Sequence, residues 1–247
     1  MNERLKAAAL GGLIGAASIL AAVCGAAALG FIPLASDARL HAYLMTHPGL
    51  AEEMQAKAEA EQILAEQRQQ QAAVDKLGLK KFFDPAVAYV TGPVHAKNTF
   101  VEFFDYNCGH CRNTYPNVRQ FFDKHRNDTR FAFIDYPIFG EDSTNAARAA
   151  VAARRQGDLY VAYHFALMGE GKKAIDGQIL IDDARKAGLD VRKLSADVLA
   201  PGTDQAIVAA LKLAREAHFS GTPLFIVNGK VHEGEISAAE LAQLTRR

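Results

Sequence analysis

The stretch VEFFDYNCGHCRNTYP, residues 101–116, determines how the rest of the chain is interpreted. A run rich in aromatic residues, NTFVEFFDY, ends just before Cys108 and is typical of a buried strand. The segment CRNTYPNVRQFFDKH follows with helical spacing, which gathers Val118, Phe121 and Phe122 on one face. Cys108 therefore lies where a strand passes into a helix. The Cys-x-x-Cys spacing alone fits a metal clip, a structural disulfide or a redox centre.

The segments beyond this junction predict the fold. RFAFIDYPI reads as the next strand, so that strand, helix and strand form a parallel crossover unit. Residues 141–218 read as mainly helical, with expected N-caps at Ser143, Asp158, Asp176, Asp190 and Thr203. PLFIVNGK and VHEGE then form a hairpin, and SAAELAQL a terminal helix. This order predicts an α/β fold of thioredoxin-like topology with a helical insertion at about residues 141–218.

The composition narrows the class of protein. The chain has 247 residues, of which 49% are hydrophobic, enough for a sizeable core. Lys and Arg together number 28, as do Asp and Glu, and this balance argues against nucleic acid as a partner. Three cysteines are too few for a scaffold held together by disulfides.

Residues 1–36 carry basic side chains at their start and then no charge from residue 7 to residue 36. A cleaved signal has an apolar core of about 7–15 residues, whereas a spanning helix needs about 20. The run therefore favours an uncleaved membrane anchor. The alternatives are a signal cleaved at an Ala-x-Ala pattern ending at Ala28, and a buried helix. An anchor or a signal would export everything from Asp37 onward.

Residues 37–83 are predicted to form a helical stalk. It breaks at THPG, where Pro48 can begin a helix but not continue one. The following segment is rich in Ala, Glu, Gln and Lys and has only a thin apolar stripe. A helix from Pro48 to Leu77 would reach about 45 Å. Two interpretations stay open: a solvated spacer, and an oligomerisation segment in which RLHAYLMTHPGL supplies the apolar contact.

Three separated features, FVEFFDYNCGHC, GTPLFIVNG and the inserted helices, make residues 84–247 resemble the DsbA family of exported thiol–disulfide oxidoreductases. LHAYLMTHP with the helix after it resembles the ScsC-like subgroup, suppressors of copper sensitivity, whose N-terminal segment forms trimers. The resemblance implies a bacterial periplasmic protein, tethered to the inner membrane or released. It also implies exported protein substrates, a membrane redox partner, and neither a cofactor nor a metal.

The position of each cysteine predicts a separate role for Cys108 and for Cys111. A helix N-terminus offers free N–H groups and about half a positive charge, which favours the thiolate of Cys108. We expect Cys108 to be the exposed nucleophile and Cys111, one turn into the helix, the shielded resolving thiol. His110 adds a positive charge or a donor, and Gly109 permits a close backbone approach. A lowered Cys pKa stabilises the reduced form and makes the disulfide a stronger oxidant.

Glu102, Thr222 and Pro223 complete the predicted site. The resemblance implies a buried acid at Glu102, whose raised pKa would let it carry the proton of Cys111. The alternative is a strand residue whose side chain reaches solvent. The resemblance also implies a cis bond between Thr222 and Pro223 beside the cysteines, whereas the residues alone favour an ordinary trans proline. The Thr222 backbone would pair with an extended substrate.

The predicted function is disulfide formation, reduction or isomerisation, because the same site can serve all three. One alternative is a copper- or zinc-binding protein that uses Cys108, His110 and Cys111, although structural zinc generally takes four ligands. Another is an inert adaptor whose stalk is the working part. We further expect the exported part, residues 37–247, to be an oligomer of three copies, with isomerase activity that depends on the stalk.

Overall fold

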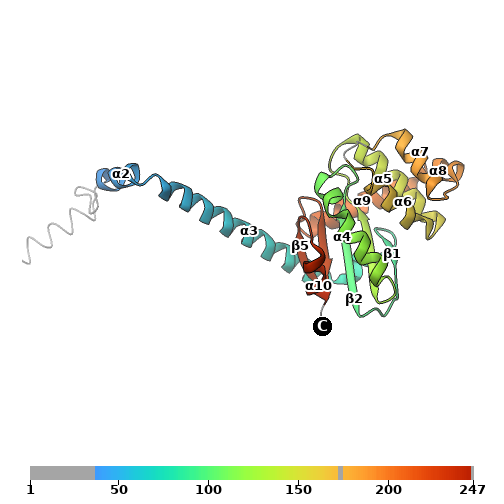
Figure 1. Ribbon diagram of the computed structural model, residues 1–247, viewed down its shortest axis with the longest axis horizontal. Coiled ribbons are helices and arrows are strands. Elements are labelled where there is room, and N and C mark those ends of the chain that lie inside the picture. Colours follow the sequence, from blue (N-terminus) through green and yellow to red (C-terminus); the bar gives the residue numbers. More distant parts are fainter. Residues whose placement is uncertain (1–36, 172–174, 246–247) are drawn as a thin grey trace, which may run out of the picture. The chain divides into compact units, whose positions relative to one another are not determined.

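The computed structural model describes residues 37–171 and 175–245, so the expected anchor or signal at residues 1–36 lies outside them (Figure 1). In this described part of the chain, no helix combines the length and the apolar character needed to cross a membrane. The chain divides after Ile63 into two units, Met1–Ile63 and Leu64–Arg247, which are taken separately below.

The smaller unit contains α2 (Asp37–Thr46) and the first part of α3 (Gly49–Leu77). The two helices are separated at His47 and Pro48, as the sequence predicted. The Thr46 hydroxyl donates to the Ala42 carbonyl at 3.0 Å, which satisfies one of the last carbonyls of α2. Large apolar side chains of this unit lie exposed to solvent; they are Leu40, Tyr43, Leu44, Met45, Met54 and Ile63.

The sequence placed the start of the domain at residue 84, but the larger unit begins well before that residue. Gln70 and Val74, in the last turns of α3, are buried. The Gln71 amide donates to the Gly229 carbonyl at 2.8 Å and accepts from the Val231 N–H at 3.0 Å. The short 3₁₀ helix η1 (Leu79–Phe83) then buries its two phenylalanines. The end of the expected stalk is therefore part of the larger unit.

A five-stranded sheet forms the centre of the larger unit, in the order β1-β3-β2-β4-β5. The strands are β1 (Tyr89–Thr91), β2 (Asn98–Phe104), β3 (Thr129–Asp135), β4 (Leu224–Val227) and β5 (Lys230–Glu233). β2 and β3 are parallel, and the other neighbours are antiparallel. The central strands are almost wholly buried, which explains their continuous apolar runs. β1, with three residues, was not predicted.

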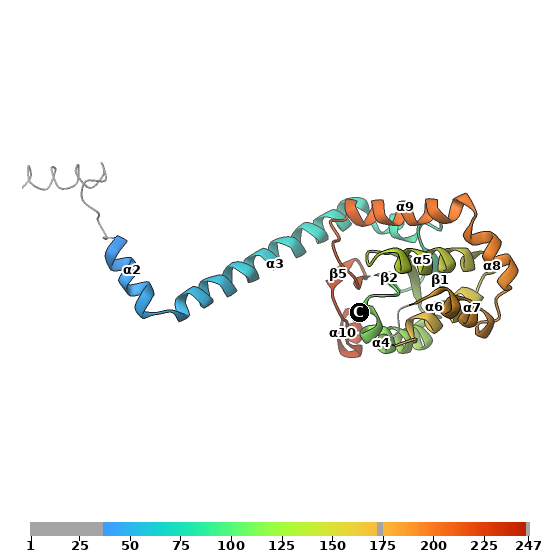
Figure 2. The ribbon, with the colours of Figure 1, turned by 90° about the horizontal axis from the view of Figure 1, so that it is seen from above.

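Helices cover both faces of this sheet (Figures 1 and 2). They are α4 (Gly109–His125), α5 (Glu141–Ala153), η2 (Arg154–Gln156), α6 (Leu159–Met168), α7 (Gly177–Lys186), α8 (Val191–Val198), α9 (Pro201–Glu216) and α10 (Ala238–Thr245). Alternate side chains of β2 point to opposite faces of the sheet and pack in two separate hydrophobic cores. Phe100 and Phe104 pack in a core that includes residues of α4 and α6, whereas Val101 and Phe103 pack with residues of η1 and α9. The inserted helical block, α5 to α9, is confirmed. The expected N-caps Ser143 and Thr203 are wrong, because α5 and α9 begin earlier, after Gly140 and Ala200.

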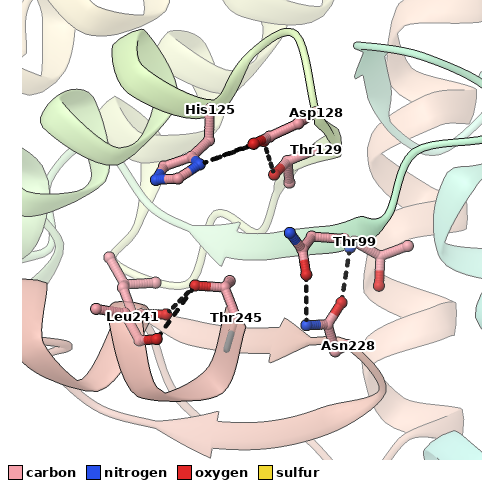
Figure 3. A network of polar contacts seen from close by, with 9 residues as sticks. Thr99, His125, Asp128, Thr129, Asn228, Leu241 and Thr245 are labelled. Carbon is pink, nitrogen blue, oxygen red and sulfur yellow. Dashed lines mark hydrogen bonds and ion pairs between the residues drawn. The ribbon is translucent and has the colours of Figure 1, made fainter. Parts of the chain in front are cut away.

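A polar network holds the start of β2, at the end of the strand opposite to Cys108 (Figure 3). Asn228, in the β4–β5 turn with φ 51°, accepts from the Thr99 N–H at 3.0 Å. Its amide group donates to the Asn98 side chain at 3.0 Å and to the Leu244 carbonyl at 2.9 Å. The hairpin and the C-terminal helix thereby fix the register of the strand that leads to the cysteines.

Candidate active site

The turn between β2 and α4 presents Cys108. The Asp105 carboxylate accepts from the Asn107 N–H at 2.7 Å, and the Cys108 N–H donates to the Asp105 carbonyl at 3.1 Å. Cys108 itself is the N-cap of α4, with extended backbone angles φ −77° and ψ 119°. An Asp one residue past an apolar strand is a common turn former, and here it directs the chain from the sheet into the helix. The predicted strand–helix junction is confirmed.

Both cysteines are buried and free, each with 1% of its surface exposed. The expectation that Cys108 would be exposed is therefore wrong. The reason is the segment of Thr222, whose carbonyl accepts from the Cys108 thiol at 3.2 Å. A reacting partner must meet Cys108 beside this carbonyl. The path to the sulfur is therefore bordered by the turn after β2 and by the segment of Thr222 before β4.

The two thiols differ in acidity. The pKa of Cys108 is lowered to about 6, chiefly by a hydrogen bond from the Cys111 thiol, against the effect of burial. The Thr222 side chain and the N–H groups of Cys111 and His110 lower it further. The pKa of Cys111 is raised, first by burial and then by the hydrogen bond and charge of Cys108. Near neutral pH, Cys108 is thus mainly a thiolate and Cys111 a thiol.

His110 faces away from the core and contacts a residue that the sequence did not single out. Its Nδ1 lies 2.8 Å from the Glu235 Oε1, and the Asn113 amide donates to the same oxygen at 3.0 Å. The hydrogen bond to Glu235 raises the pKa of His110, while Asn113 and His110 lower the pKa of Glu235. The charge of Cys108 also raises the pKa of His110, so a protonated His110 and a Cys108 thiolate stabilise each other. Sequence analysis assigned Glu235 no functional role, and placed it only as the last residue of VHEGE in the predicted hairpin.

Glu102 lies in the middle of β2 with 2% of its surface exposed, so the solvent-reaching alternative is wrong. In the sheet it is level with Phe133 on β3 and Phe225 on β4. Its Oε2 has no hydrogen-bond partner, and burial raises its pKa to about 8. It is also close enough to Cys111 for its charge to raise the thiol pKa. The carboxyl is therefore mostly protonated at neutral pH, and it can gain or lose a proton at pH values close to neutral.

The bond between Thr222 and Pro223 is cis, as the resemblance implied. The buried Thr222 Oγ1 makes no hydrogen bond while Cys108 is a neutral thiol, so its hydroxyl is free to donate to the Cys108 thiolate, and this lowers the pKa of Cys108. The Pro223 carbonyl accepts from the Gly234 N–H at 2.9 Å. At Gly109, by contrast, a Cβ would meet no atom within 4 Å. The fold itself does not require glycine there, and its role in the approach of a partner stays a prediction.

Two further side chains, Asp105 and Asn107, tie the cysteine turn to neighbouring loops. The Asp105 carboxylate accepts from the Ile138 N–H at 2.7 Å and from the Phe139 N–H at 3.2 Å. The Asn107 carbonyl oxygen accepts from the Ile175 N–H at 2.9 Å. Sequence analysis missed both residues, because a hydrogen bond to a distant loop leaves no periodic pattern.

Arg112 also holds the turn. Its Nε donates to the Tyr106 carbonyl at 2.7 Å, and its other nitrogens donate to the Asn107 side chain at 3.1 Å and to the Gly171 carbonyl at 2.6 Å. Among residues 37–171 and 175–245, no three His, Cys, Asp or Glu side chains are grouped so that they could share a metal ion. The ring of His110 pairs with Glu235 and does not join the sulfurs.

The family model described as thioredoxin matches residues 86–245. Among curated proteins, the Na(+)/H(+) antiporter NhaA of Herminiimonas arsenicoxydans is 28% identical over 158 residues, which make up 63% of this chain and 24% of the antiporter. The chain thus spans about a quarter of the length of the curated relatives it matches.

Several solved structures are similar to the chain. A thioredoxin-like oxidoreductase from Silicibacter pomeroyi DSS-3 is 39% identical, with a TM-score of 0.60 over 67% of this chain and 94% of that one. The thiol-disulfide exchange protein alpha-DsbA2 from Wolbachia pipientis is 22% identical (TM-score 0.66; 73% and 96% covered). The catalytic domain of Proteus mirabilis ScsC is also 22% identical (TM-score 0.62; 71% and 96% covered). The resemblance to DsbA and ScsC proteins is confirmed in the fold.

Proposed function

Because the chain belongs to the thioredoxin family, we propose that it is a thiol–disulfide oxidoreductase in which Cys108 attacks and Cys111 resolves. The observation that carries this proposal is the opposite shift of the two thiol pKa values, that of Cys108 falling to about 6 and that of Cys111 rising. One sulfur is thereby prepared to attack while its neighbour keeps its proton.

The reaction proceeds in two displacements. The Cys108 thiolate attacks one sulfur of a substrate disulfide, which forms a mixed disulfide and releases the other substrate sulfur as a thiolate. Cys111 then gives up its proton and attacks Cys108, which forms the Cys108–Cys111 disulfide and releases the second substrate thiolate. Two electrons pass from the protein to the substrate. The reverse sequence oxidises a substrate dithiol, and return of the mixed disulfide to a different substrate sulfur isomerises it.

Glu102 exchanges the proton of Cys111 in this scheme. With a pKa of about 8, its carboxyl is neither a permanent anion nor a permanent acid near neutral pH. A carboxylate there accepts the Cys111 proton as that thiol attacks, and a carboxylic acid returns it in the reverse direction. Thr222 contributes the carbonyl beside Cys108, and in the complex its backbone pairs with the extended substrate.

The substrates proposed are exported proteins. The uncharged run at residues 7–36 favours a membrane anchor or signal, and everything after it would then act in the periplasm. The partner that returns Cys108 and Cys111 to their starting redox state is proposed to be a membrane redox protein. Oxidation, reduction and isomerisation share the same site, and the direction depends on the reduction potential relative to that partner.

We also propose that α2 and the first part of α3 associate several copies of the chain, and that the assembly is a trimer. Support comes from the exposed apolar side chains of Leu40, Tyr43 and Met45, which are 57%, 53% and 70% exposed. Single exposed apolar side chains are ordinary on a protein surface. Three of them within six residues of one short helix are unusual and indicate a surface that another chain covers. Several active sites around a shared space would retain a misfolded substrate during isomerisation.

Alkylation of the reduced protein tests the central proposal. Iodoacetamide should label Cys108 at a rate that rises with a midpoint near pH 6, while Cys111 stays unlabelled until the protein unfolds. Peptide mass spectrometry identifies the labelled residue. Equal labelling of both cysteines, or a Cys108 midpoint near 8.5, would contradict the assignment of nucleophile and resolving thiol.

A further inference from the structure

A groove of about 380 Å³ lies between α5, α7 and α8 in the inserted helical block (Figure 2 shows these helices together). Apolar side chains from all three helices and the residue after α8 line it; they include Ala149, Leu180, Ile181, Leu194, Val198 and Leu199. Leu199 is 86% exposed. A concave site of this size with mostly apolar walls is typical of a binding site.

One end of the groove meets the cysteine turn through Asn107. Ile175 and Asp176 line this end, and the Ile175 N–H donates to the Asn107 side chain at 2.9 Å. Asn107 directly precedes Cys108. Through this hydrogen bond, Ile175 in the wall of the groove is joined to the residue that directly precedes the reactive cysteine.

A second connection runs through Asp105. Its carboxylate holds the backbone of Ile138 and Phe139, and the Phe139 side chain is 55% exposed. The chain then passes into α5, whose early residues Asp142 and Asn145 line the groove. The loop before α5 and the loop before α7 are thus both held by side chains of the cysteine turn.

We propose that this groove is a second binding site for the substrate polypeptide, occupied by an extended apolar segment a few residues from the cysteine engaged at Cys108. This inference rests on the proposed function. Asn107 contacts Ile175 and adjoins Cys108, and an extended chain advances about 3.3 Å per residue, so a segment a few residues from the engaged cysteine would reach this part of the groove. Apolar segments are buried in native proteins and exposed in unfolded ones, so the groove would select unfolded substrates.

The charges on the groove favour a polypeptide over a fatty acid. Asp142 and Asp176 contribute two carboxylates, and no Lys or Arg is among the lining residues in the part of the chain that the structure describes. An anionic amphiphile would bring its own carboxylate near these groups, which is repulsive. A peptide segment carries apolar side chains with no obligatory negative charge.

Substrate kinetics with the full chain test the proposal. One substrate is an unstructured peptide of about twelve residues, with one cysteine followed by a Leu/Val/Ile-rich segment and supplied as its mixed disulfide with glutathione. The other substrate is glutathione disulfide. Leu199→Glu should raise KM for the peptide about fivefold or more with kcat unchanged, and leave the reaction with glutathione disulfide unaltered. Val208→Glu, which replaces a 59% exposed apolar residue on α9, is the matched control and should change neither.

Two kinetic results would overturn the proposal: an unchanged KM for the peptide in Leu199→Glu, or an equal loss with both substrates, which would mean that the substitution perturbs the active site. A binding assay without redox chemistry separates this inference from the proposed function. A fluorescent peptide with serine in place of cysteine should bind the wild type and Val208→Glu equally, and Leu199→Glu about fivefold more weakly. If no variant exchanges disulfides, this anisotropy measurement still decides the role of the groove. Binding of dodecanoate without binding of the peptide would also overturn it.

Discussion

His110 and Glu235 form a 2.8 Å contact between the cysteine loop and the segment after β5, although 125 positions separate them in the chain. The carboxylate keeps the imidazole more basic than a free histidine, since it raises the pKa of His110. Cys108 has the same effect on His110, so a protonated His110 and a Cys108 thiolate favour each other. Glu235 thus acts on the thiolate through His110 and without touching it.

Replacing Glu235 with Gln should therefore weaken the nucleophile. His110 would lose its proton at lower pH, and Cys108 would become a thiolate only at higher pH. Because both partners are exposed to solvent, the alkylation rate of Cys108 at pH 6 should fall by less than about threefold, and the difference should shrink at high salt. Asp204→Asn, which removes an exposed carboxylate paired with Arg148, is the control and should leave the rate unchanged. A pH profile of Glu235→Gln identical to that of the wild type would remove Glu235 from the mechanism.

Thr222→Val removes a hydroxyl beside Cys108 with little change of shape. The Thr222 side chain is one of the groups that lower the pKa of Cys108, so its loss should raise that pKa from about 6, by about one unit, as when one of several charge-assisted hydrogen bonds is removed. Thiolate absorbance during a pH titration measures the change. The control is Thr99→Val, because the Thr99 hydroxyl is also buried without a partner but lies at the other end of β2. If both variants titrate like the wild type, the Thr222 hydroxyl does not stabilise the thiolate.

Glu102→Gln should change the pH dependence of stability. The folded pKa is raised, so between about pH 4.5 and pH 8 the folded state binds more protons than the unfolded state. The wild type therefore loses stability as pH rises through this window, by at most about 1.4 kcal/mol per pH unit from this group. Gln does not titrate, so urea unfolding should show the variant increasingly more stable than the wild type from pH 5 to pH 8. Glu52→Gln, at an exposed position of α3, is the matched control and should run parallel to the wild type.

The same Glu102 variant tests the proton carrier. Attack by Cys108 should keep its rate, whereas resolution by Cys111 should slow, because the proton of Cys111 loses its nearby acceptor. Single-turnover mixing with a disulfide substrate separates the two steps. Resolution at the wild-type rate across pH 5–8 would show that Glu102 does not carry this proton.

Particular residues show what the sequence could and could not predict. The burial of Glu102 followed from a strand with no polar face, and the position of Cys108 followed from the change of period at the cysteines. The burial of Cys108 did not follow, because Thr222 covers it from a segment more than a hundred positions away. Nor did the start of the domain at Leu64: Gln70 and Gln71 look like solvated residues in a polar helix, yet one is buried and the other hydrogen-bonds to the hairpin that ends in β5. Polar residues that pair with backbone leave no hydrophobic signal.

That boundary determines how the stalk is to be tested. Deleting residues 37–77 would remove Gln70, Gln71 and Val74 from the larger unit and damage the domain along with the stalk. Deleting residues 37–63 stops where the larger unit begins. Residues 37–247 should form an oligomer, with a trimer as the expected size, by light scattering, and residues 64–247 should be a monomer.

The shorter form should keep the Cys108 pKa and its reaction with glutathione disulfide, because every residue of the site lies after residue 64. Its activity on scrambled ribonuclease should fall about tenfold or more, since separate sites no longer hold one misfolded chain at high effective concentration. Tyr43→Glu together with Met45→Glu in the longer form should reproduce both effects without any deletion, because it places charge on the exposed apolar side chains of α2. The control is Glu52→Gln, at an exposed polar position of α3, which should change neither the assembly nor the activity. A monomeric form of residues 37–247, or undiminished isomerase activity in residues 64–247, would leave the stalk as a spacer and the domain as an oxidoreductase that works alone.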